Sequence, residues 1–202
     1  IHEIAGIFSG TLSWLFQKYD AQIPFSVLMK DALAQGLTEP DPREDLSGRD
    51  VQRKLLILAR AAGFKLQLAD IDVQSLVPES LRDLDKEHFL SQSSQLDEYF
   101  LTQFTQAKQN DHCIRYVARF SAKSGKLKAK VSLEQLPEND AFANLSPCDN
   151  IFQITSQWYS ENPLIIRGPG AGRDVTAGGL HSDLVAICRQ LSNRSTPVKI
   201  KG

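Results

Sequence analysis

The first part of the chain has apolar residues at the spacing that is typical of helices. After the segment Ser9-Gly10-Thr11, apolar side chains recur at i, i+3, i+4 and i+7, at Leu12, Leu15, Phe16 and Tyr19. This spacing predicts a first helix with Ser9 or Thr11 near its cap. A second helix is predicted over residues 25–35, where Gly36 in the C′ position would end it.

Two further helical segments are predicted before residue 111. Asp45 or Ser47 can cap a third helix that ends at Gly63. Within it, residues 55–59 read Leu-Leu-Ile-Leu-Ala, which is apolar on every side, so we expect this helix to be largely buried. The stretch 78–110 is charged and helical in pattern, and its expected inner face consists of Phe89, Leu96, Tyr99, Phe100 and Phe104.

The pattern changes to alternation after residue 112. Residues 113–120 predict a strand, Ser124-Gly125 a turn, and residues 126–133 a second strand, so together they predict a hairpin. The second strand would turn its apolar residues inward, at Leu127, Ala129, Val131 and Leu133. The other predicted elements are short strands at 73–78, 150–155 and 163–167 and a final helix at 176–191.

This order of elements indicates a fold class. Helices first and antiparallel strands later predict an α+β domain with a mixed β-sheet covered by helices. At 202 residues, of which 42% are apolar, the chain is one large domain or two small ones.

Composition excludes several classes of function. The chain has 23 basic and 24 acidic residues and a net charge of −1, so it has no basic surplus for nucleic acid. No apolar run approaches the ~20 residues that span a membrane, and no signal peptide is visible. The three cysteines are far apart and lack CxxC spacing, which predicts reduced thiols in a cytoplasmic protein. The four histidines are equally scattered, so we expect no metal site.

The start of the chain suggests that it is part of a longer protein. The only methionine is Met29, and the sequence begins at Ile1. A natural gene product would begin with methionine, so we expect a fragment of something longer.

Residues 36–54 concentrate the candidate chemistry. Prolines stiffen a loop with four carboxylates, which is followed by a helix where Asp50 and Lys54 are spaced i,i+4 and project from one face. An acid and a lysine on a buried helix are costly unless they pair with each other or with a ligand. The segment therefore favours a pocket for a small amino acid, and a solvated turn followed by a structural ion pair is the alternative. The four loop carboxylates are Glu39, Asp41, Glu44 and Asp45.

Two other segments are weaker candidates. The glycine-rich residues 168–176 follow an apolar strand and open a helix, an arrangement that directs backbone N–H groups at phosphate. They match neither the GxGxxG pattern nor the P-loop, so tight strand-to-helix packing is the alternative. The N–H groups of Ser9-Gly10-Thr11 could hold a carboxylate, with plain helix capping as the alternative.

Three segments, in this order, resemble the homoserine dehydrogenases. They are Gly6-Ile7-Phe8-Ser9-Gly10-Thr11, Gly36-Leu37-Thr38-Glu39-Pro40-Asp41-Pro42 through Lys54, and Asn162-Pro163 through Thr176. The detailed sequence of residues 1–6, 13–16 and 167–176 is similar to that of the bifunctional aspartokinase–homoserine dehydrogenases. It is most similar to the methionine-branch form.

The resemblance implies a fold and a domain organisation. The fold would be that of the glyceraldehyde-3-phosphate dehydrogenase C-terminal domain, and residues 1–202 would be the catalytic, substrate-binding and dimerisation domain of a homodimer. In the family a Rossmann domain precedes this part, and in bifunctional members an aspartokinase precedes both, so both would be covalently linked in the parent. The cofactor, NADP or NAD, would be bound mainly by the missing domain.

The resemblance also implies a reaction and a set of site residues. The family interconverts L-aspartate 4-semialdehyde and L-homoserine with NAD(P)H, in threonine and methionine biosynthesis. Lys54 matches the catalytic lysine, a proton donor, and Glu39 matches the residue that holds the α-ammonium of the substrate. Asp45 and Asp50 match acids that orient substrate, water and the lysine. The remaining matches are the turn beside the substrate, Gly10 and Thr11, and a glycine that closes over the cofactor, Gly172.

Two rival functions remain. One is a non-catalytic dimerisation or regulatory module of a larger enzyme, which would have no use for Lys54 among acids. The other is a different semialdehyde or sugar dehydrogenase that shares the fold. The missing active-site cysteine expected of phosphorylating aldehyde dehydrogenases argues against it.

Overall fold

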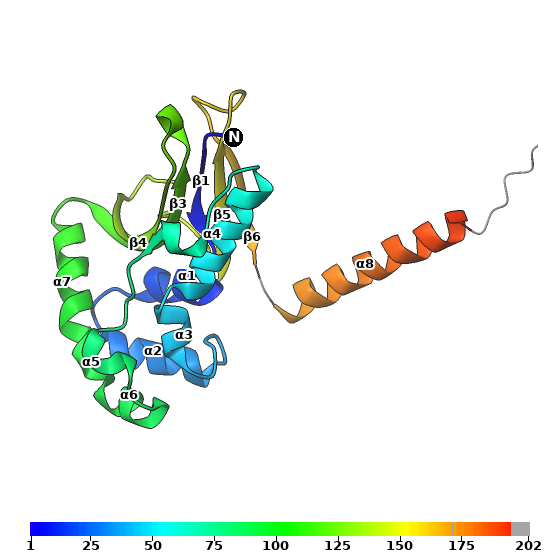
Figure 1. Ribbon diagram of the computed structural model, residues 1–202. Helices are drawn as coiled ribbons and strands as arrows, with labels where there is room; N and C mark the ends of the chain where they lie inside the picture. Colours follow the sequence, from blue (N-terminus) through cyan, green and yellow to red (C-terminus); the bar gives the residue numbers. More distant parts are fainter. Residues whose placement is uncertain (171, 195–202) are drawn as a thin grey trace, which may run out of the picture.

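A six-stranded sheet with helices packed on it forms the body of the molecule (Figure 1). The structure is a computed structural model that describes residues 1–170 and 172–194. The strand order is β2-β4-β3-β1-β5-β6; β2 pairs with β4 in parallel and every other neighbouring pair is antiparallel. The predicted α+β class with a mixed sheet is confirmed. The strands are β1 (Glu3–Ile7), β2 (Ile71–Val73), β3 (His112–Ser121), β4 (Lys128–Pro137), β5 (Asp149–Thr155) and β6 (Leu164–Pro169).

The central strand β1 was not predicted from the sequence. It pairs with β3 on one side and with β5 on the other, so that Glu3 lies opposite both Ser121 and Thr155. Ile4 belongs to the main core on the helix-covered face, while Ile7 belongs to a smaller cluster of the core. Because both faces of β1 are buried, the strand shows no alternation of polar and apolar residues.

The first two helices agree with the prediction. Ser9 is the N-cap of α1 (Gly10–Lys18), and its hydroxyl accepts the N–H of Leu12 at 3.2 Å. The second helix, α2 (Phe25–Ala34), ends where Gly36 takes a φ of +70°. Both helices contribute side chains to the main core.

The carboxylate loop differs from the prediction because it contains a helix. Asp41 caps the short helix α3 (Pro42–Leu46), and Gly48, at φ +73°, is the N-cap of α4 (Arg49–Ala61). The predicted caps Asp45 and Ser47 are therefore wrong, because one lies inside α3 and the other is its C-cap. We call the turn at 47–48 the α3–α4 elbow.

Helix α4 is amphipathic, so the prediction of a buried helix is wrong. Leu55, Leu56 and Ala59 are buried against the sheet, whereas Ile57 is 64% exposed. The apolar run 55–59 continues around the helix, but only one side of it contacts the strands β3 and β4. Which side of the helix is buried depends on the strands that pack against it, and the apolar residues 55–59 alone do not show this.

The middle of the chain largely agrees with the prediction. Residues 78–110 form α5 (Glu79–Arg82), α6 (Lys86–Gln92), a 3₁₀ turn (Ser93–Leu96) and α7 (Asp97–Lys108). Of the predicted inner residues, Phe89, Leu96 and Phe100 are buried, and Tyr99 is exposed. The β3–β4 hairpin is confirmed, although Leu127 is exposed rather than inward. The early strand is β2 at 71–73, so its predicted position at 73–78 is wrong.

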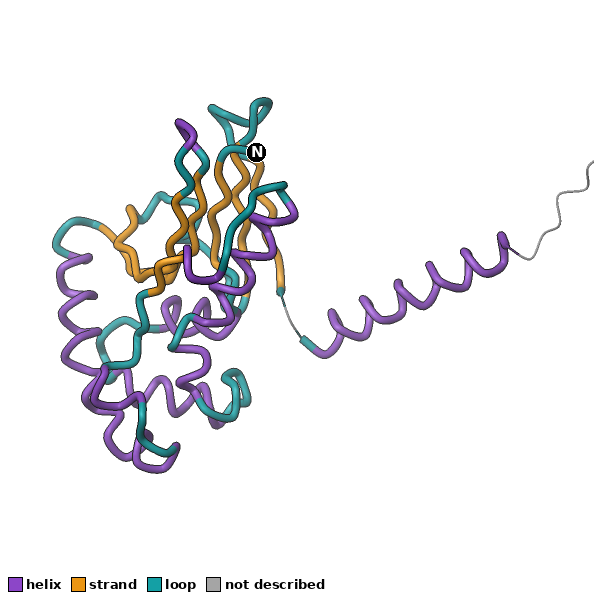
Figure 2. The backbone as a smooth tube through the Cα atoms, in the orientation of Figure 1, coloured by secondary structure: helices purple, strands orange, loops and turns teal. Residues whose placement is uncertain are grey.

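The last two elements lie at the edge of the body. Strand β6 pairs only with β5 among the strands, and its apolar side chains Leu164, Ile165 and Ile166 are exposed. Helix α8 (Arg173–Arg194) extends away from the sheet (Figures 1 and 2). Its apolar side chains are exposed, at Val175, Leu180, Leu184, Ile187 and Leu191. Among residues 1–170 and 172–194, no helix has both the length and the apolar character needed to cross a membrane.

Candidate active site

Two turns place the candidate site at one end of the sheet. The first follows β1, where Phe8 and Ser9 lead into α1. The second is the α3–α4 elbow, where Gly48 reverses the chain between Asp45 and Asp50. Helix α1 contacts α3, so the two turns face each other across the site.

Lys54 is held by two oxygens. Its Nζ lies 2.8 Å from Asp50 Oδ2, one turn earlier on α4, and donates a hydrogen bond to the carbonyl oxygen of Phe8 at 2.9 Å. An ammonium group has three N–H donors, so one donor remains for a ligand. The side chains of Lys54 and Asp50 are 46% and 50% exposed. The expectation of a buried lysine is therefore wrong for the chain as described, because Lys54 lies on the side of α4 that faces away from the core.

Asp45 lies among a second group of hydrogen-bonding and charged residues. Its Oδ2 accepts the backbone N–H of Glu39 at 2.9 Å, and the Thr11 hydroxyl donates to the carbonyl oxygen of Leu37 at 2.7 Å. Burial raises the pKa of the Asp45 carboxyl, and the nearby charges of Glu39 and Asp50 raise it further. The hydrogen bond from the Glu39 N–H acts in the opposite direction. The carboxylates of Glu39 and Asp50 are therefore close enough to Asp45 for their negative charges to affect its ionisation.

The structure brings together most of the residues predicted for the site. Lys54 contacts Asp50, and Asp45 accepts the Glu39 N–H and lies near the charge of Asp50. Thr11 bonds to Leu37, two residues before Glu39. In the part of the chain that the structure describes, Gly172 is not among them: a Cβ built there meets Val175 alone within 4 Å. Gly10, at the first turn of α1, lies near Cys148: a Cβ built on it would be 3.5 Å from the Cys148 carbonyl oxygen.

Sequence reasoning missed one functional group, the carbonyl oxygen of Phe8. It orients Lys54 from a strand end that is 46 residues away in sequence. A backbone acceptor leaves no mark in residue identity, so no sequence signal could have identified it. The phenyl ring of Phe8 stacks on Phe152 with centroids 4.9 Å apart, which fixes this part of the backbone.

Of the two glycines that lie between β6 and α8, Gly170 is crowded and Gly172 is not. A Cβ on Gly170 would lie 2.0 Å from Asn150 Nδ2, and Gly172 has a φ of +139°. Among residues 1–170 and 172–194, no cluster of three or more His, Cys, Asp or Glu side chains could hold a metal ion.

Comparison with known proteins identifies the family. The family profile described as homoserine dehydrogenase matches residues 1–185, which is most of the chain. This chain belongs to the homoserine dehydrogenase family. The predicted resemblance is therefore confirmed.

Several homoserine dehydrogenase relatives are bifunctional. The chain is 49% identical over 191 residues to the bifunctional aspartokinase/homoserine dehydrogenase 2 of Escherichia coli, covering 95% of the chain and 23% of that protein. It is 46% identical over 192 residues to the chloroplastic bifunctional enzyme of Daucus carota, covering 95% of the chain and 21% of that protein. The chain thus spans about a fifth of the length of these relatives.

Solved structures show the same fold. A Candida auris protein of unknown function superposes with a TM-score of 0.84 at 36% identity, over 94% of this chain and 54% of that one. The homoserine dehydrogenase of Staphylococcus aureus superposes with a TM-score of 0.74 at 21% identity, over 100% of this chain and 46% of that one. The second likeness supports the fold alone.

Proposed function

We propose that this chain is the substrate-binding and catalytic part of a homoserine dehydrogenase, which interconverts L-aspartate 4-semialdehyde and L-homoserine. The observation that carries the proposal is Lys54, whose ammonium is fixed by Asp50 and the Phe8 carbonyl oxygen with one N–H left over. Family membership supplies the reaction class.

The proposed chemistry follows from the charge that develops on the substrate. Hydride addition to the aldehyde carbon moves the C=O π electron pair onto oxygen, and that oxygen then takes a proton from the free N–H of Lys54. In the reverse direction, neutral Lys54 removes the proton from the hydroxyl of homoserine as hydride leaves. Asp50 stabilises the ammonium form and keeps Nζ aimed at the reacting oxygen.

The carboxylates would hold the amino-acid end of the substrate. Burial raises the pKa of the Asp45 carboxyl, and repulsion from the negative charge of Glu39 raises it further. The α-ammonium of the substrate relieves this repulsion, which favours its binding there. Gly10 and Thr11 form the turn beside it.

The cofactor would be NADP or NAD, held mainly by a dinucleotide-binding domain outside this chain. When bound, the nicotinamide supplies or accepts the hydride. Within this chain, Gly172 is the residue that would close over it, and its φ of +139° is a backbone conformation that favours glycine. We also propose that the parent carries an aspartokinase domain, as the names of its relatives indicate for those proteins.

We also propose that the enzyme is cytoplasmic and acts in threonine and methionine biosynthesis. We propose further that it forms a homodimer. Ile165 and Ile166 on the edge strand β6 are exposed, and so is Trp158 in the loop before it. An exposed apolar edge strand in a soluble monomer is an aggregation hazard, and a second copy of the chain would cover it. The same exposed strand also favours the second candidate function, a dimerisation module without catalysis.

One experiment separates these functions. A longer polypeptide that joins this chain to its dinucleotide-binding domain is assayed for NAD(P)⁺ reduction with L-homoserine. Lys54→Ala should reduce turnover by ~10²–10⁴-fold, the usual contribution of a proton donor. Lys30→Ala, which removes an exposed positive charge on α2, is the matched control and should leave turnover unchanged.

The isolated 202-residue chain provides the second arm of this experiment. It should show essentially no turnover, because hydride transfer needs the nicotinamide held against the reacting carbon. Turnover by the isolated chain, or near wild-type activity of Lys54→Ala, would overturn the proposed mechanism. Absence of activity in the longer polypeptide would favour the dimerisation module.

A further inference from the structure

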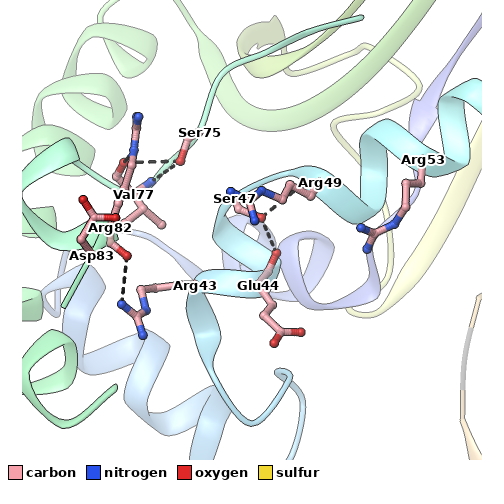
Figure 3. Close-up of a pocket in the computed structure, with 9 residues that line it drawn as sticks. All are labelled: Arg43, Glu44, Ser47, Arg49, Arg53, Ser75, Val77, Arg82 and Asp83. Carbon is pink, nitrogen blue, oxygen red and sulfur yellow. Dashed lines mark hydrogen bonds between the residues drawn. The ribbon is translucent and has the colours of Figure 1, made fainter. Parts of the chain in front are cut away.

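A groove lined by arginines lies beside the α3–α4 elbow (Figure 3). Its volume is about 430 Å³, within the range of small-molecule sites. One side comes from α3 and α4 and the other from the segment 75–83. Its lining residues are Arg43, Glu44, Ser47, Arg49, Arg53, Ser75, Val77, Arg82 and Asp83.

Arg43 forms a fixed wall of this groove. Its Nη2 lies 2.6 Å from Asp41 Oδ2, and its Nη1 donates to the carbonyl oxygens of Leu81 and Arg82 at 3.4 and 3.2 Å. The guanidinium also lies over the ring of Phe89. Arg43 therefore ties the segment 75–83 to α3 and keeps the two sides of the groove together.

Three other guanidinium groups are available for a ligand. The Arg49 side chain forms no hydrogen bond or ion pair with any residue that the structure describes. Arg53 Nη2 is 3.9 Å from Asp50 Oδ1 at an exposed position, where Lys54 holds the other oxygen of that carboxylate at 2.8 Å. Arg82 Nε donates to the carbonyl oxygen of Val77 at 3.1 Å, which leaves its two Nη groups, and Nη1 is 3.7 Å from the exposed Glu79. Exposed ion pairs this long contribute little, so a ligand could replace them at small cost.

The charge of the groove favours an anion. Four guanidinium groups face two carboxylates, Glu44 and Asp83, and within the described ranges neither carboxylate pairs with a basic side chain. Planar guanidinium forks bind phosphate through paired, charge-assisted hydrogen bonds. A single phosphate occupies one or two forks, whereas a chain of two phosphates can meet three.

We propose that this groove is a binding site for a diphosphate group, either free or as part of a nucleotide. Its lining does not include Lys54 or Asp45, although Arg53 lies 3.9 Å from Asp50 and so joins the edge of the groove to the acid cluster. Arg49, Arg53 and Arg82 provide the phosphate contacts, and Arg43 keeps the two sides at a fixed spacing. Binding needs no turnover, so the proposal stands independently of the dehydrogenase function.

This site can be tested by calorimetric titration of the 202-residue chain with pyrophosphate, ADP, AMP and citrate. Each titration is done in 150 mM NaCl, where the Debye length of ~8 Å screens long-range attraction between charges. Pyrophosphate or ADP should bind saturably with one site per chain. Arg49→Ala should weaken binding by about tenfold to a hundredfold, because it removes one charge-assisted fork. Arg49→Lys should recover only part of the loss, since it keeps the charge without the fork. Lys30→Ala is the matched control for an exposed positive charge outside the groove, and should bind like the parent chain.

The four ligands distinguish the source of the diphosphate. Equal affinity for pyrophosphate and ADP supports recognition of the phosphate chain alone, and tighter binding of ADP supports a nucleotide. Equal affinity for AMP and ADP, or for citrate and pyrophosphate, would overturn the assignment. So would the absence of saturable binding, or binding that neither Arg49→Ala nor Arg82→Ala weakens in variants with unchanged circular dichroism.

Discussion

The hydroxyl of Tyr116 occupies the position that a side chain on Gly48 would need. A Cβ built on Gly48 would lie 2.0 Å from that hydroxyl oxygen, which donates a hydrogen bond to the carbonyl oxygen of Gln74 at 2.7 Å. Gly48 also has a φ of +73°. The α3–α4 elbow therefore rests on a buried strand residue, and this contact positions both the acid cluster and the arginine groove.

Gly48→Ala should destabilise the fold because it combines an unfavourable φ with a steric clash. Gly36→Ala is the control, since Gly36 has a φ of +70° and no described atom within 4 Å of a built Cβ. The backbone strain is common to both, so Gly48→Ala should cost roughly 1–3 kcal/mol more. Urea unfolding of the two variants measures the difference, and equal free energies of unfolding would contradict the tight contact.

Asp41→Asn should destabilise the chain at neutral pH. The hydrogen bond from Arg43 lowers the pKa of the Asp41 carboxyl, so the folded state favours its charged form. This stabilisation is present above the ordinary carboxyl pKa of 3.8 and is lost as the pH falls through the lowered value. Asparagine can still cap α3, so we expect a loss of about 1–2 kcal/mol at pH 7 from the weakened charge-assisted bonds to Arg43. Thermal unfolding from pH 7 to pH 2 should show the difference disappearing in acid.

Asp45→Asn should have the opposite effect. Burial raises the pKa of the Asp45 carboxyl, so its charged form is disfavoured in the folded state. The stability that the neutral acid contributes is full below 3.8 and is lost as the pH rises through the raised value. The amide oxygen of asparagine can still accept the Glu39 N–H. The variant should therefore melt at a higher temperature than the parent chain at pH 7 and at a similar one at pH 3. A lower melting temperature at pH 7 would show that the charge on Asp45 is stabilising.

Lys54→Arg should fail as a replacement in the longer dehydrogenase polypeptide. A guanidinium stays protonated at all working pH values, so it cannot act as the proton donor and acceptor that the reaction needs. It can still pair with Asp50, so the fold should be retained. The measurement is kcat for L-homoserine oxidation, expected to fall ~10²-fold or more. Activity close to the parent would show that residue 54 supplies only charge.

Ile166→Lys should convert the proposed dimer into a monomer. Ile166 is 53% exposed on the edge strand β6, and a lysine there would place a charge in the covered surface. Val27→Lys on α2 is the control, because Val27 is also an exposed apolar residue but lies outside β6. Light scattering at micromolar concentration measures the mass. A monomer mass for the unmodified chain would refute the dimer.

The helices were predictable because their signals are local. Apolar spacing identified α1 and α2, and Gly36 marked the end of α2. Strand β1 was missed because Ile4 and Ile7 are buried on different faces of the sheet, so no polar residue marks a solvent side. The exposure of Ile57 also escaped prediction, because it depends on which strands lie under α4.

The site was predictable in its side chains and not in its backbone. The i,i+4 spacing correctly placed Asp50 beside Lys54. The Phe8 carbonyl oxygen that holds the lysine comes from a distant strand end, and no residue type reveals it. The arginine groove escaped for a similar reason, because Arg49 and Arg82 come from segments that only the tertiary fold brings to one groove.

The position of β1 also has a consequence for synthesis on the ribosome. Glu3 pairs with Ser121 and Thr155, so the strand at the middle of the sheet emerges long before either neighbour. At about 5–20 residues per second, it waits for roughly 8–30 s before β5 can pair with it. Until β3 emerges both edges of this apolar strand are open to other nascent chains, and the edge that faces β5 stays open longest. Helices α1 and α2 follow it directly, and they are the first elements able to shield it.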